Sequence, residues 1–519
     1  MKTNHYKISV LVFFALFLLT GFLIFDDYGL SWDEPIQHVT GTVTLNYLRS
    51  GDEALWTYQD RYYGTIVETP LAWLAEKVGV ANSRELFLFR HLMTFLIFAV
   101  GVLAFYFLCR RRFGPSWLAL AGPIFLVFSP RIFADAFYNS KDIPFLVGWI
   151  VSVLTLVRLL ERFSWGRIVA HALACAVLII IRLPGLLMIA ITIGILGADW
   201  LLDSSKRKLW QSYLLKNVSY LLATTVFIVC LWPFLWQNPI GHFIEAFATM
   251  SRFSPQLNLS VLYLGQSILA SQLPWHYILV WIAITTPIVY LLLGLVGVGI
   301  IGREVVSKKV VGYTHWRFDV VVLGWFVGPI FAVIILGSVL YDGWRHLYFV
   351  YPALILLGLI GLQWLLGQIK KLNADMALAA KVVLSLLVFG QIFLVGSFMV
   401  RNHPHQNLYF NLLAGDLAKA RNNFDLDYWG LTFRPGLEYL AANDPDPIIP
   451  IAFVYGYDST VILPPNLAAR FKVLSGDISQ AKYILSNYRW QDYSKLPLPA
   501  EVYSVKVDGE RVMSIFRLR

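Results

Sequence analysis

Long apolar runs separated by short polar segments dominate the chain. The first run spans 8–25, and further runs lie near 87–108, 116–130, 143–160, 168–183, 185–202, 218–235, 277–301, 320–340, 346–367 and 380–400. A helix needs about 20 mostly apolar residues to cross a bilayer, and it satisfies its own backbone hydrogen bonds there. The pattern predicts about eleven transmembrane helices. The first run lacks a small-residue cleavage site, so we expect an uncleaved anchor.

Composition supports a membrane protein and excludes several other classes. Hydrophobic residues make up 58% of the 519 residues and charged residues only 14%, whereas soluble domains carry roughly 25% charged residues. A soluble enzyme and a disordered chain are therefore excluded. The three cysteines, Cys109, Cys175 and Cys230, all lie in apolar runs, which argues against a disulfide framework.

The net charge of +10 comes from basic residues in alternate connections between the apolar runs. These residues are Arg110 to Arg112, Arg162, Arg167, Lys206 to Lys208, Arg303, Lys308, Lys309, Lys370 and Lys371. Basic connections lie on the cytoplasmic side of a membrane. We therefore expect a multi-pass inner-membrane protein with a cytoplasmic N-terminus, and no nucleic-acid partner.

This topology places three sizeable segments outside the cell membrane: 26–85, about 236–276, and the chain after Arg401. In the first outer loop, 26–85, Ser31 can cap a helix. Apolar residues at helical spacing predict two amphipathic surface helices there: Ile36, Val39 and Val43 in one, and Ile66, Leu71, Leu74 and Val78 in the other.

The tail after Arg401 changes in character. Short β-rich runs at 448–455, 481–486 and 502–507, a turn at Asp508-Gly509 and a helix over 435–442 predict a small α/β domain. The predicted organisation is a transmembrane module over 1–400 and an extracytoplasmic domain over 401–519. Within the tail, Asp425-Leu426-Asp427 has the spacing of a metal-binding acid pair, but we expect a solvated turn.

Four polar clusters coincide with predicted outer ends of the spans: Ser31 to Glu34, Arg131 to Asp142, Pro274 to Tyr277, and Tyr341 to His346. Polar side chains beside a membrane are costly unless they line water or a site. A carboxylate such as Asp33 can accept a proton from an attacking hydroxyl. Basic side chains can neutralise an anionic leaving group such as a phosphate, and the candidates are Arg131, Lys141, Arg345 and His346.

Adjacent helical residues point about 100° apart, so Asp33 and Glu34 are expected to have different roles. Glu34 is expected to face His38, four residues along. We expect Asp33, Arg345 and His346 to meet at one water-facing site.

Each candidate also has a structural interpretation. Asp33 and Glu34 are favourable charges at a helix N-terminus, and Arg131 and Lys141 can be snorkelling interface residues. Trp275, Tyr277 and Trp344 suit an aromatic belt, which is the preferred interpretation for Trp344. His276 and His346 suit either role. The sequence contains no zinc-protease, paired CxxC, phosphate-loop or dinucleotide-binding motif.

At these residues the chain resembles polytopic GT-C glycosyltransferases, in particular the protein O-mannosyltransferase and aminoarabinose transferase branch. The resemblance covers about the first 430 residues. It rests on the anchor followed by Asp33-Glu34, on Asn139 to Pro144, Pro274 to Tyr277 and Tyr341 to His346, and on 403–430 with Asn407 to Asn411 and Asp427 to Gly430.

The resemblance implies an inverting transfer of a sugar from a polyprenyl-phosphate donor to a hydroxyl of a glycan, lipid or protein acceptor. Asp33 would be the base, and Arg131, Lys141, Arg345 and His346 would hold the donor phosphate. Supporting site residues would be Glu34, His38, Asn139, Asp142, Trp275, His276, Tyr341 and Asp342. No cofactor is certain. A divalent metal ion stays an open alternative, with Glu34, Asp135, Asp142 and Asp342 as oxygen ligands.

Two alternatives use the same lipid carrier. A flippase or transporter would also need basic residues for a lipid phosphate, but it would show polar or broken helices near mid-membrane. A polymerase or ligase of polyprenyl-linked sugars would share most of the site. A purely structural or receptor role would leave the outer acids unexplained.

Overall fold

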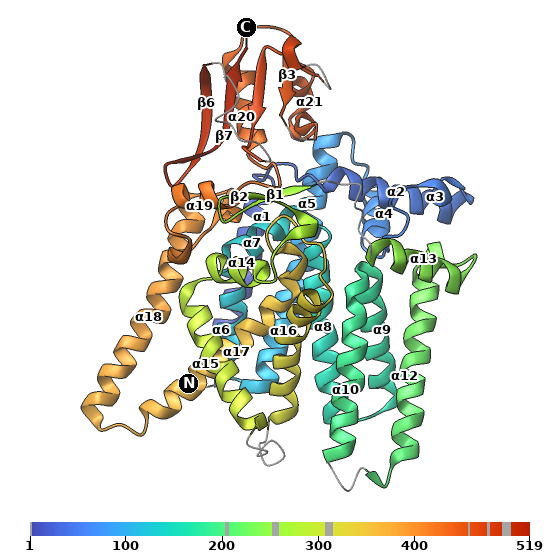
Figure 1. Ribbon diagram of the computed structural model, residues 1–519, viewed down its shortest axis with the longest axis vertical. Coiled ribbons are helices and arrows are strands. Elements are labelled where there is room, and N and C mark those ends of the chain that lie inside the picture. Colours follow the sequence, from blue (N-terminus) through green and yellow to red (C-terminus); the bar gives the residue numbers. More distant parts are fainter. Residues whose placement is uncertain are drawn as a thin grey trace.

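Long apolar helices form the larger part of the computed structural model, and a small β-sheet caps one end of them (Figure 1). The structure describes residues 3–202, 207–251, 259–306, 315–454, 457–474, 478–489 and 500–518. Lys206, Lys308 and Lys309, and the end of the strand expected over 448–455, lie outside these residues. The N-terminus lies at the end of the bundle opposite the sheet. We call the two ends the sheet end and the opposite end.

The helices follow the chain in this order: α1 (Thr3–Ile24), α2 (Glu34–Ser50), α3 (Ala54–Thr57), α4 (Glu68–Val78), α5 (Ser83–Phe113), α6 (Trp117–Val127), α7 (Pro130–Tyr138), α8 (Asp142–Glu161), α9 (Trp165–Ile181), α10 (Leu186–Leu202), α12 (Trp210–Leu231), α13 (Pro239–Ser251), α14 (Tyr277–Thr285), α15 (Ile288–Val306), α16 (Trp316–Ile335), α17 (Tyr351–Ile369), α18 (Ala374–Arg401), α19 (Leu417–Asn423), α20 (Phe433–Asn443) and α21 (Pro465–Ala468).

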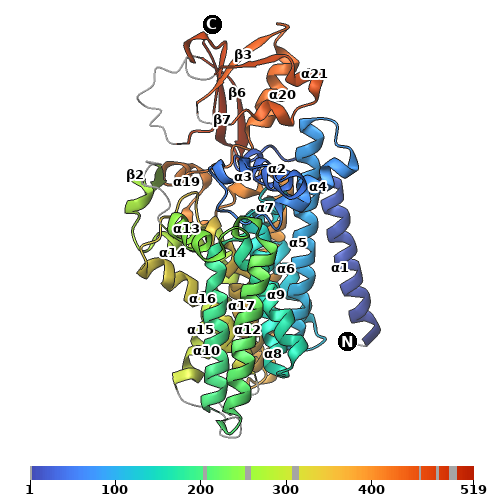
Figure 2. The same ribbon diagram turned by 90° about the vertical axis from the view of Figure 1, so that its right-hand side faces the viewer.

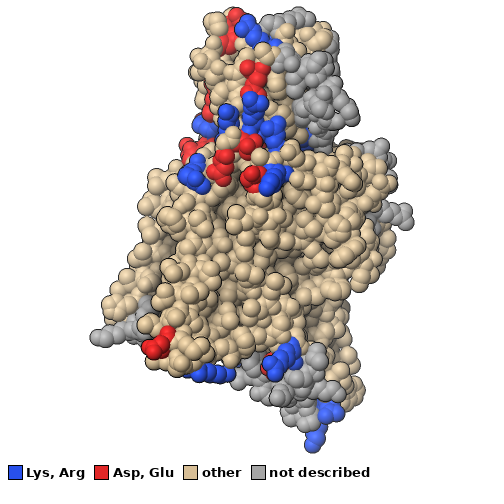
Figure 3. Space-filling model, turned by 60° about the vertical axis from the view of Figure 1, so that its left-hand side comes forward, with Lys and Arg blue, Asp and Glu red and all other residues tan. Residues whose placement is uncertain are grey.

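The chain is a multi-pass membrane protein. Among the described residues, nine helices are long and apolar enough to span a bilayer, and the bent pair α6 and α7 makes up to ten. This pair corresponds to the run expected at 116–130, and the run at 168–183 forms the shorter α9, with 17 residues. Figure 3 shows a broad band without charged side chains between a charged junction near the sheet and a charged rim at the opposite end.

Prolines interrupt two of the expected spans near the sheet end. The run at 277–301 is not one helix, because Pro287 separates α14 from α15, and Thr286 before it is extended. The Asn411 side chain donates hydrogen bonds of 2.6 Å to the carbonyl oxygens of Ala283 and Thr286. The Asn411 side chain thus satisfies backbone carbonyl groups that lack a helical partner at the break.

The second interruption is a 65° bend between α6 and α7. Pro130 occupies the first turn of α7, where its missing N–H costs nothing. All nine residues of α7 are buried. The bend therefore directs the segment that contains Arg131 and Asp135 into the interior, below the first outer loop.

The first outer loop contains α2, α3 and α4 beside the sheet end of the bundle (Figure 2). Ser31 does not cap α2: Asp33 is the N-cap residue and makes no capping hydrogen bond. The buried face of α2 is largely polar, with Gln37, Thr40 and Thr44, while Val39 is 46% exposed. α2 packs closely against α4, where a Cβ on Gly41 would lie 2.4 Å from the Glu68 carbonyl oxygen.

A small sheet domain follows α18, as the sequence predicts. The strands are β3 (Ile449–Phe453), β4 (Phe471–Val473), β5 (Tyr483–Ser486), β6 (Glu501–Val507) and β7 (Glu510–Arg517), in the order β4-β3-β5-β7-β6. β3 pairs in parallel with β4 and β5, and β7 is antiparallel to β5 and β6. Asp508 and Gly509 form the hairpin turn, with φ of 47° and 87°. A separate hairpin, β1 (Ser260–Tyr263) and β2 (Gln266–Leu269), was not predicted.

A tightly folded segment, the 425–432 loop, connects the bundle to the sheet domain. Asp427 is 1% exposed, so the expectation of a solvated turn is wrong. Its carboxylate accepts hydrogen bonds from the backbone N–H groups of Gly430, Leu431 and Thr432 and from the Thr432 hydroxyl. The carboxylate therefore organises a loop that would otherwise bury several unpaired donors.

Replacement of Asp427 by Ala should destabilise the protein by roughly 2–4 kcal/mol, because buried N–H groups lose their acceptor. The thermal unfolding midpoint in detergent measures this loss. Asp427→Asn keeps one carbonyl oxygen and should lose less. As a control, Asp416→Ala removes an exposed N-cap of α19 and should cost about 1 kcal/mol. Equal effects of the Asp427→Ala and Asp416→Ala changes would contradict this role.

Candidate active site

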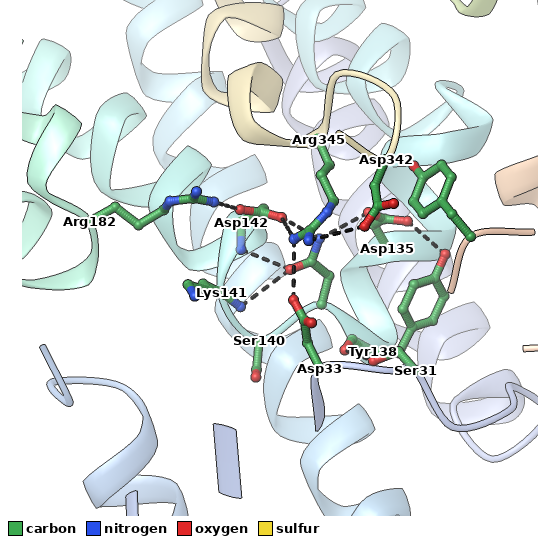
Figure 4. Close-up of polar contacts among 12 residues, drawn as sticks. Ser31, Asp33, Asp135, Tyr138, Ser140, Lys141, Asp142, Arg182, Asp342 and Arg345 are labelled. Carbon is green, nitrogen blue, oxygen red and sulfur yellow. Dashed lines mark hydrogen bonds and ion pairs between the residues drawn. The ribbon is translucent and has the colours of Figure 1, made fainter. Parts of the chain in front are cut away.

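Arg345 is the centre of a buried ionic cluster at the sheet end (Figure 4). It begins the short 3₁₀ helix Arg345–Val350 that leads into α17, and its side chain is 4% exposed. Its Nη1 donates to Asp33 at 3.2 Å and to Asp142 at 3.1 Å, and its Nη2 donates to Asp342 at 3.3 Å. One guanidinium therefore joins the first outer loop, the start of α8 and the α16–α17 connection.

Asp33 and Glu34 point to different partners, as their helical spacing predicts. Asp33 contacts Arg345 and keeps 24% of its side chain exposed. Glu34 is 2% exposed and accepts a hydrogen bond from the Ser31 backbone N–H at 2.8 Å. Its other oxygen lies 3.0 Å from Nε2 of His91. Asp33 is thus the accessible member of the pair, and Glu34 fixes the backbone beside it.

The expected contact between Glu34 and His38 is wrong. His38 is half-buried, and its pKa is lowered by burial and by the nearby charge of Arg90, against the opposing charge of Glu68. Glu68 accepts hydrogen bonds from Arg90 at 2.5 Å and from Ser140 at 2.7 Å. This second buried cluster holds α4 against α5 and the α7–α8 turn.

Asn139 orders the turn between α7 and α8. Its Nδ2 donates to Asp135 at 3.0 Å and to Asp142 at 3.1 Å. Its Oδ1 accepts from the backbone N–H of Asp142 at 2.8 Å. Asp135 also accepts from the Tyr138 hydroxyl at 2.6 Å. The amide thus aligns two carboxylates, one of which contacts Arg345.

Lys141 lies beside this cluster with its Nζ 3.4 Å from the centre of the Tyr63 ring. Burial, followed by repulsion from Arg182, lowers the pKa of Lys141 to about 7, while Asp33 and Asp60 act in the opposite direction. Within the described chain, no carboxylate lies at ion-pair distance from this Nζ. The amine thus faces the ring of Tyr63 rather than a carboxylate.

Two cationic residues of the cluster were not predicted. Arg182, between α9 and α10, is ion-paired with Asp142, and Arg489 of the sheet domain is ion-paired with Asp342. A signal for Arg182 exists in the sequence, since an arginine closes an apolar run at a predicted outer end. The segment around Arg489 has no comparable pattern.

Several predicted site residues have other partners. The Arg131 Nε donates to the Tyr409 carbonyl oxygen at 3.0 Å, and its guanidinium lies 4.5 Å from the Phe410 ring centre. His276 contacts the Tyr263 hydroxyl at 2.6 Å, and Trp275 is 65% exposed. His346 follows Arg345 directly, and its ring lies 4.7 Å from that of Tyr341. Lys141, Asp142 and Asp342, by contrast, lie at the cluster.

The acids considered as metal ligands are already engaged. Glu34 faces His91, Asp135 binds Tyr138 and Asn139, and Asp142 and Asp342 pair with arginines. The described residues contain no group of three or more His, Cys, Asp or Glu side chains arranged to hold a metal ion. The donor set therefore does not fit a divalent ion, and we assign no step to one.

Removal of the Arg345 guanidinium should leave Asp33 without its ion-pair partner and Asp142 and Asp342 with one arginine each. Arg345→Ala should therefore destabilise the protein by roughly 3–5 kcal/mol, seen as a lower unfolding midpoint in detergent. Asp142→Asn in the same variant should recover part of the loss. Arg401→Ala, at a side chain that is 67% exposed, should change the midpoint little. An unchanged midpoint for Arg345→Ala would contradict the arrangement.

Comparison with known proteins agrees with this architecture. Residues 71–236 match the family model described as dolichyl-phosphate-mannose-protein mannosyltransferase. No curated protein matches the chain. The apo crystal structure of ArnT from Cupriavidus metallidurans shares the fold with a TM-score of 0.50 and 16% identity, over 99% of this chain and 98% of that one.

An oligosaccharyltransferase from the archaeon Archaeoglobus fulgidus, crystallised with a tethered acceptor peptide, is also similar. It matches with a TM-score of 0.53 and 10% identity, over 93% of this chain and 69% of that one. At identities this low, the matches establish a shared fold and nothing more specific. The chain thus has the GT-C glycosyltransferase fold and is similar to the mannosyltransferase and aminoarabinose transferase branch that its sequence resembles.

Proposed function

We propose that this protein is a glycosyltransferase that moves a sugar from a polyprenyl-phosphate donor to an acceptor hydroxyl at the extracytoplasmic face of the inner membrane. The observation that carries the proposal is the 3.2 Å contact between Asp33 and Arg345, which are 312 residues apart in the chain. A protein with this fold, AglB from Archaeoglobus fulgidus, was solved in complex with a dolichol-phosphate. A lipid-phosphate donor is in keeping with that complex.

Asp33 is the proposed base. Arg345 fixes the position of the Asp33 carboxylate through the 3.2 Å contact, and the exposed part of Asp33 allows an acceptor hydroxyl to approach. In a single displacement the acceptor oxygen bonds to the anomeric carbon while the bond from that carbon to the phosphate oxygen breaks. The hydroxyl proton passes to Asp33, and the carrier leaves as polyprenyl phosphate. Attack from the face opposite the leaving group inverts the anomeric carbon.

The leaving phosphate gains one negative charge as its diester becomes a monoester, so a preorganised cation should stabilise the transition state. Arg345 and Arg182 already serve carboxylates. Among the described residues, by contrast, the Lys141 Nζ has no carboxylate at ion-pair distance and lies against the ring of Tyr63. Lys141 is therefore the proposed ligand of the donor phosphate, and Arg345 chiefly orients Asp33.

The basic connections support the proposed outward orientation of the site. The last turn of α5, with Arg110 to Arg112, and the connection between α17 and α18, with Lys370 and Lys371, lie at the opposite end of the bundle from the cluster. Basic residues favour the cytoplasmic side. The first outer loop and the sheet domain would then flank an acceptor outside the membrane.

Asp33→Asn should lower the rate of sugar transfer roughly 10²- to 10⁴-fold, because the amide cannot accept the proton. The assay uses purified protein with a labelled polyprenyl-phosphate sugar and measures released lipid phosphate together with glycosylated acceptor. Glu53→Gln, an exposed acid-to-amide change in the same loop, should leave the rate unchanged. Near-normal transfer by Asp33→Asn would remove Asp33 as base, and movement of intact lipid between leaflets without transfer would indicate a flippase.

Lys141 should make donor use dependent on pH. Its pKa of about 7 means that the cation is present below pH 7 and is lost as the pH rises through 7. The KM for donor should therefore rise between pH 6 and pH 8. Lys141→Arg, which stays charged, should abolish that rise. An identical pH dependence in the wild type and Lys141→Arg would show that another group controls it.

A further inference from the structure

The sheet domain reaches the ionic cluster through one buried arginine. Arg489 follows the end of β5, in the segment that runs back toward the bundle, and its side chain is 5% exposed. Its Nη2 is ion-paired with Asp342, and its Nη1 donates to the Tyr428 carbonyl oxygen at 2.6 Å. The guanidinium also lies 5.5 Å from the centre of the Trp32 ring, next to Asp33 in the chain.

Asp342 divides its carboxylate between two arginines. Its Oδ1 accepts from Arg489 and its Oδ2 accepts from Arg345 at 3.3 Å. The residue lies in a tight turn before Arg345, where Asp342 and Gly343 have φ of 56° and 69°. Asp is one of the few non-glycine residues that tolerate this conformation. The turn thus holds the carboxylate between the sheet domain and the cluster.

We propose that Arg489 is a positioning residue of the transfer site. The sheet domain thereby contributes to the geometry of that site. The inference rests on the proposed function. By occupying Oδ1 of Asp342, Arg489 leaves only Oδ2 for Arg345 and keeps the Arg345 Nη1 directed at Asp33. The linkage runs from Arg489 through Asp342 and Arg345 to Asp33.

Two physical effects follow from the removal of Arg489. Asp342 would be free to bind Arg345 with both oxygens, the preferred fork geometry, and would compete with Asp33 for the guanidinium. The directly paired carboxylates would also outnumber the guanidinium groups. Among the described residues, three carboxylates (Asp33, Asp142 and Asp342) pair directly with three guanidinium groups (Arg345, Arg182 and Arg489). An unbalanced negative charge would oppose an anionic donor.

A variant of a neighbouring residue, Asn487, helps to distinguish this role from simple anchoring of the sheet domain. The Asn487 side chain donates to the Asp427 carbonyl oxygen at 2.7 Å. It therefore holds the same 425–432 loop without a charge and without touching Asp342, and its Oδ1 accepts from the Arg489 backbone N–H at 3.4 Å. Asn487→Ala reports the cost of a loosened loop, and Arg489→Ala adds the loss of the ion pair.

The test measures kcat and donor KM of the full-length protein with a labelled polyprenyl-phosphate sugar. Arg489→Ala should lower kcat/KM about tenfold, more than Asn487→Ala, and Arg489→Lys should recover the donor KM but not all of kcat. Arg511→Ala, in the same domain at a side chain that is 54% exposed, is the control and should match the wild type.

A double-mutant cycle decides the mechanism. If Arg489 acts through Asp342, then Arg489→Ala should cost less than about twofold in an Asp342→Ala protein, because the two residues work as a unit. The same tenfold loss in both backgrounds would overturn the positioning role and leave the transferase intact. A wild-type protein that transfers no sugar from lipid-phosphate donors would instead overturn the proposed function, and this inference with it.

Discussion

The contact of one buried arginine with three carboxylates sets the requirements for the rest of the structure. Burial of a charge is costly unless it is paired and hydrogen-bonded, so Arg345 requires Asp33, Asp142 and Asp342 to reach it together. These acids come from the first outer loop, the start of α8 and the α16–α17 connection. Each segment must therefore be held at the sheet end with little freedom.

Interrupted helices provide this arrangement. The bend at Pro130 buries α7 and delivers the Asn139 turn, and the break at Pro287 is closed by Asn411. The 425–432 loop, organised by Asp427, lies between the bundle and the sheet domain and contributes Trp429, whose ring centre is 4.7 Å from the Arg345 guanidinium. Polar side chains thus satisfy the backbone groups that irregular segments expose, and the site is built from those segments.

The parts of this arrangement that follow local rules could be predicted from the sequence. Bilayer thickness dictates the length of apolar runs, so the spans and their shared polar ends were predictable, and so was the hairpin at Asp508-Gly509. The partner that each polar side chain contacts could not be predicted in this way. Glu34 faces His91 rather than His38 because the fold brings Nε2 of His91, on α5, to 3.0 Å from its carboxylate. A helical repeat predicts only neighbours on the same helix. In the sequence, Arg182 resembles a snorkelling interface residue. Arg489 can be recognised as part of the cluster only from the contact between the sheet domain and the bundle.

In the proposed reaction, Asp33 and Lys141 face the two sides of the bond that breaks in the donor. An experimental structure with a bound polyprenyl-phosphate sugar tests it most directly. The account predicts the phosphate within ion-pair distance of the Lys141 Nζ and the anomeric carbon on the side that faces Asp33. A phosphate held at the opposite end of the bundle, or a sugar directed away from Asp33, would contradict it.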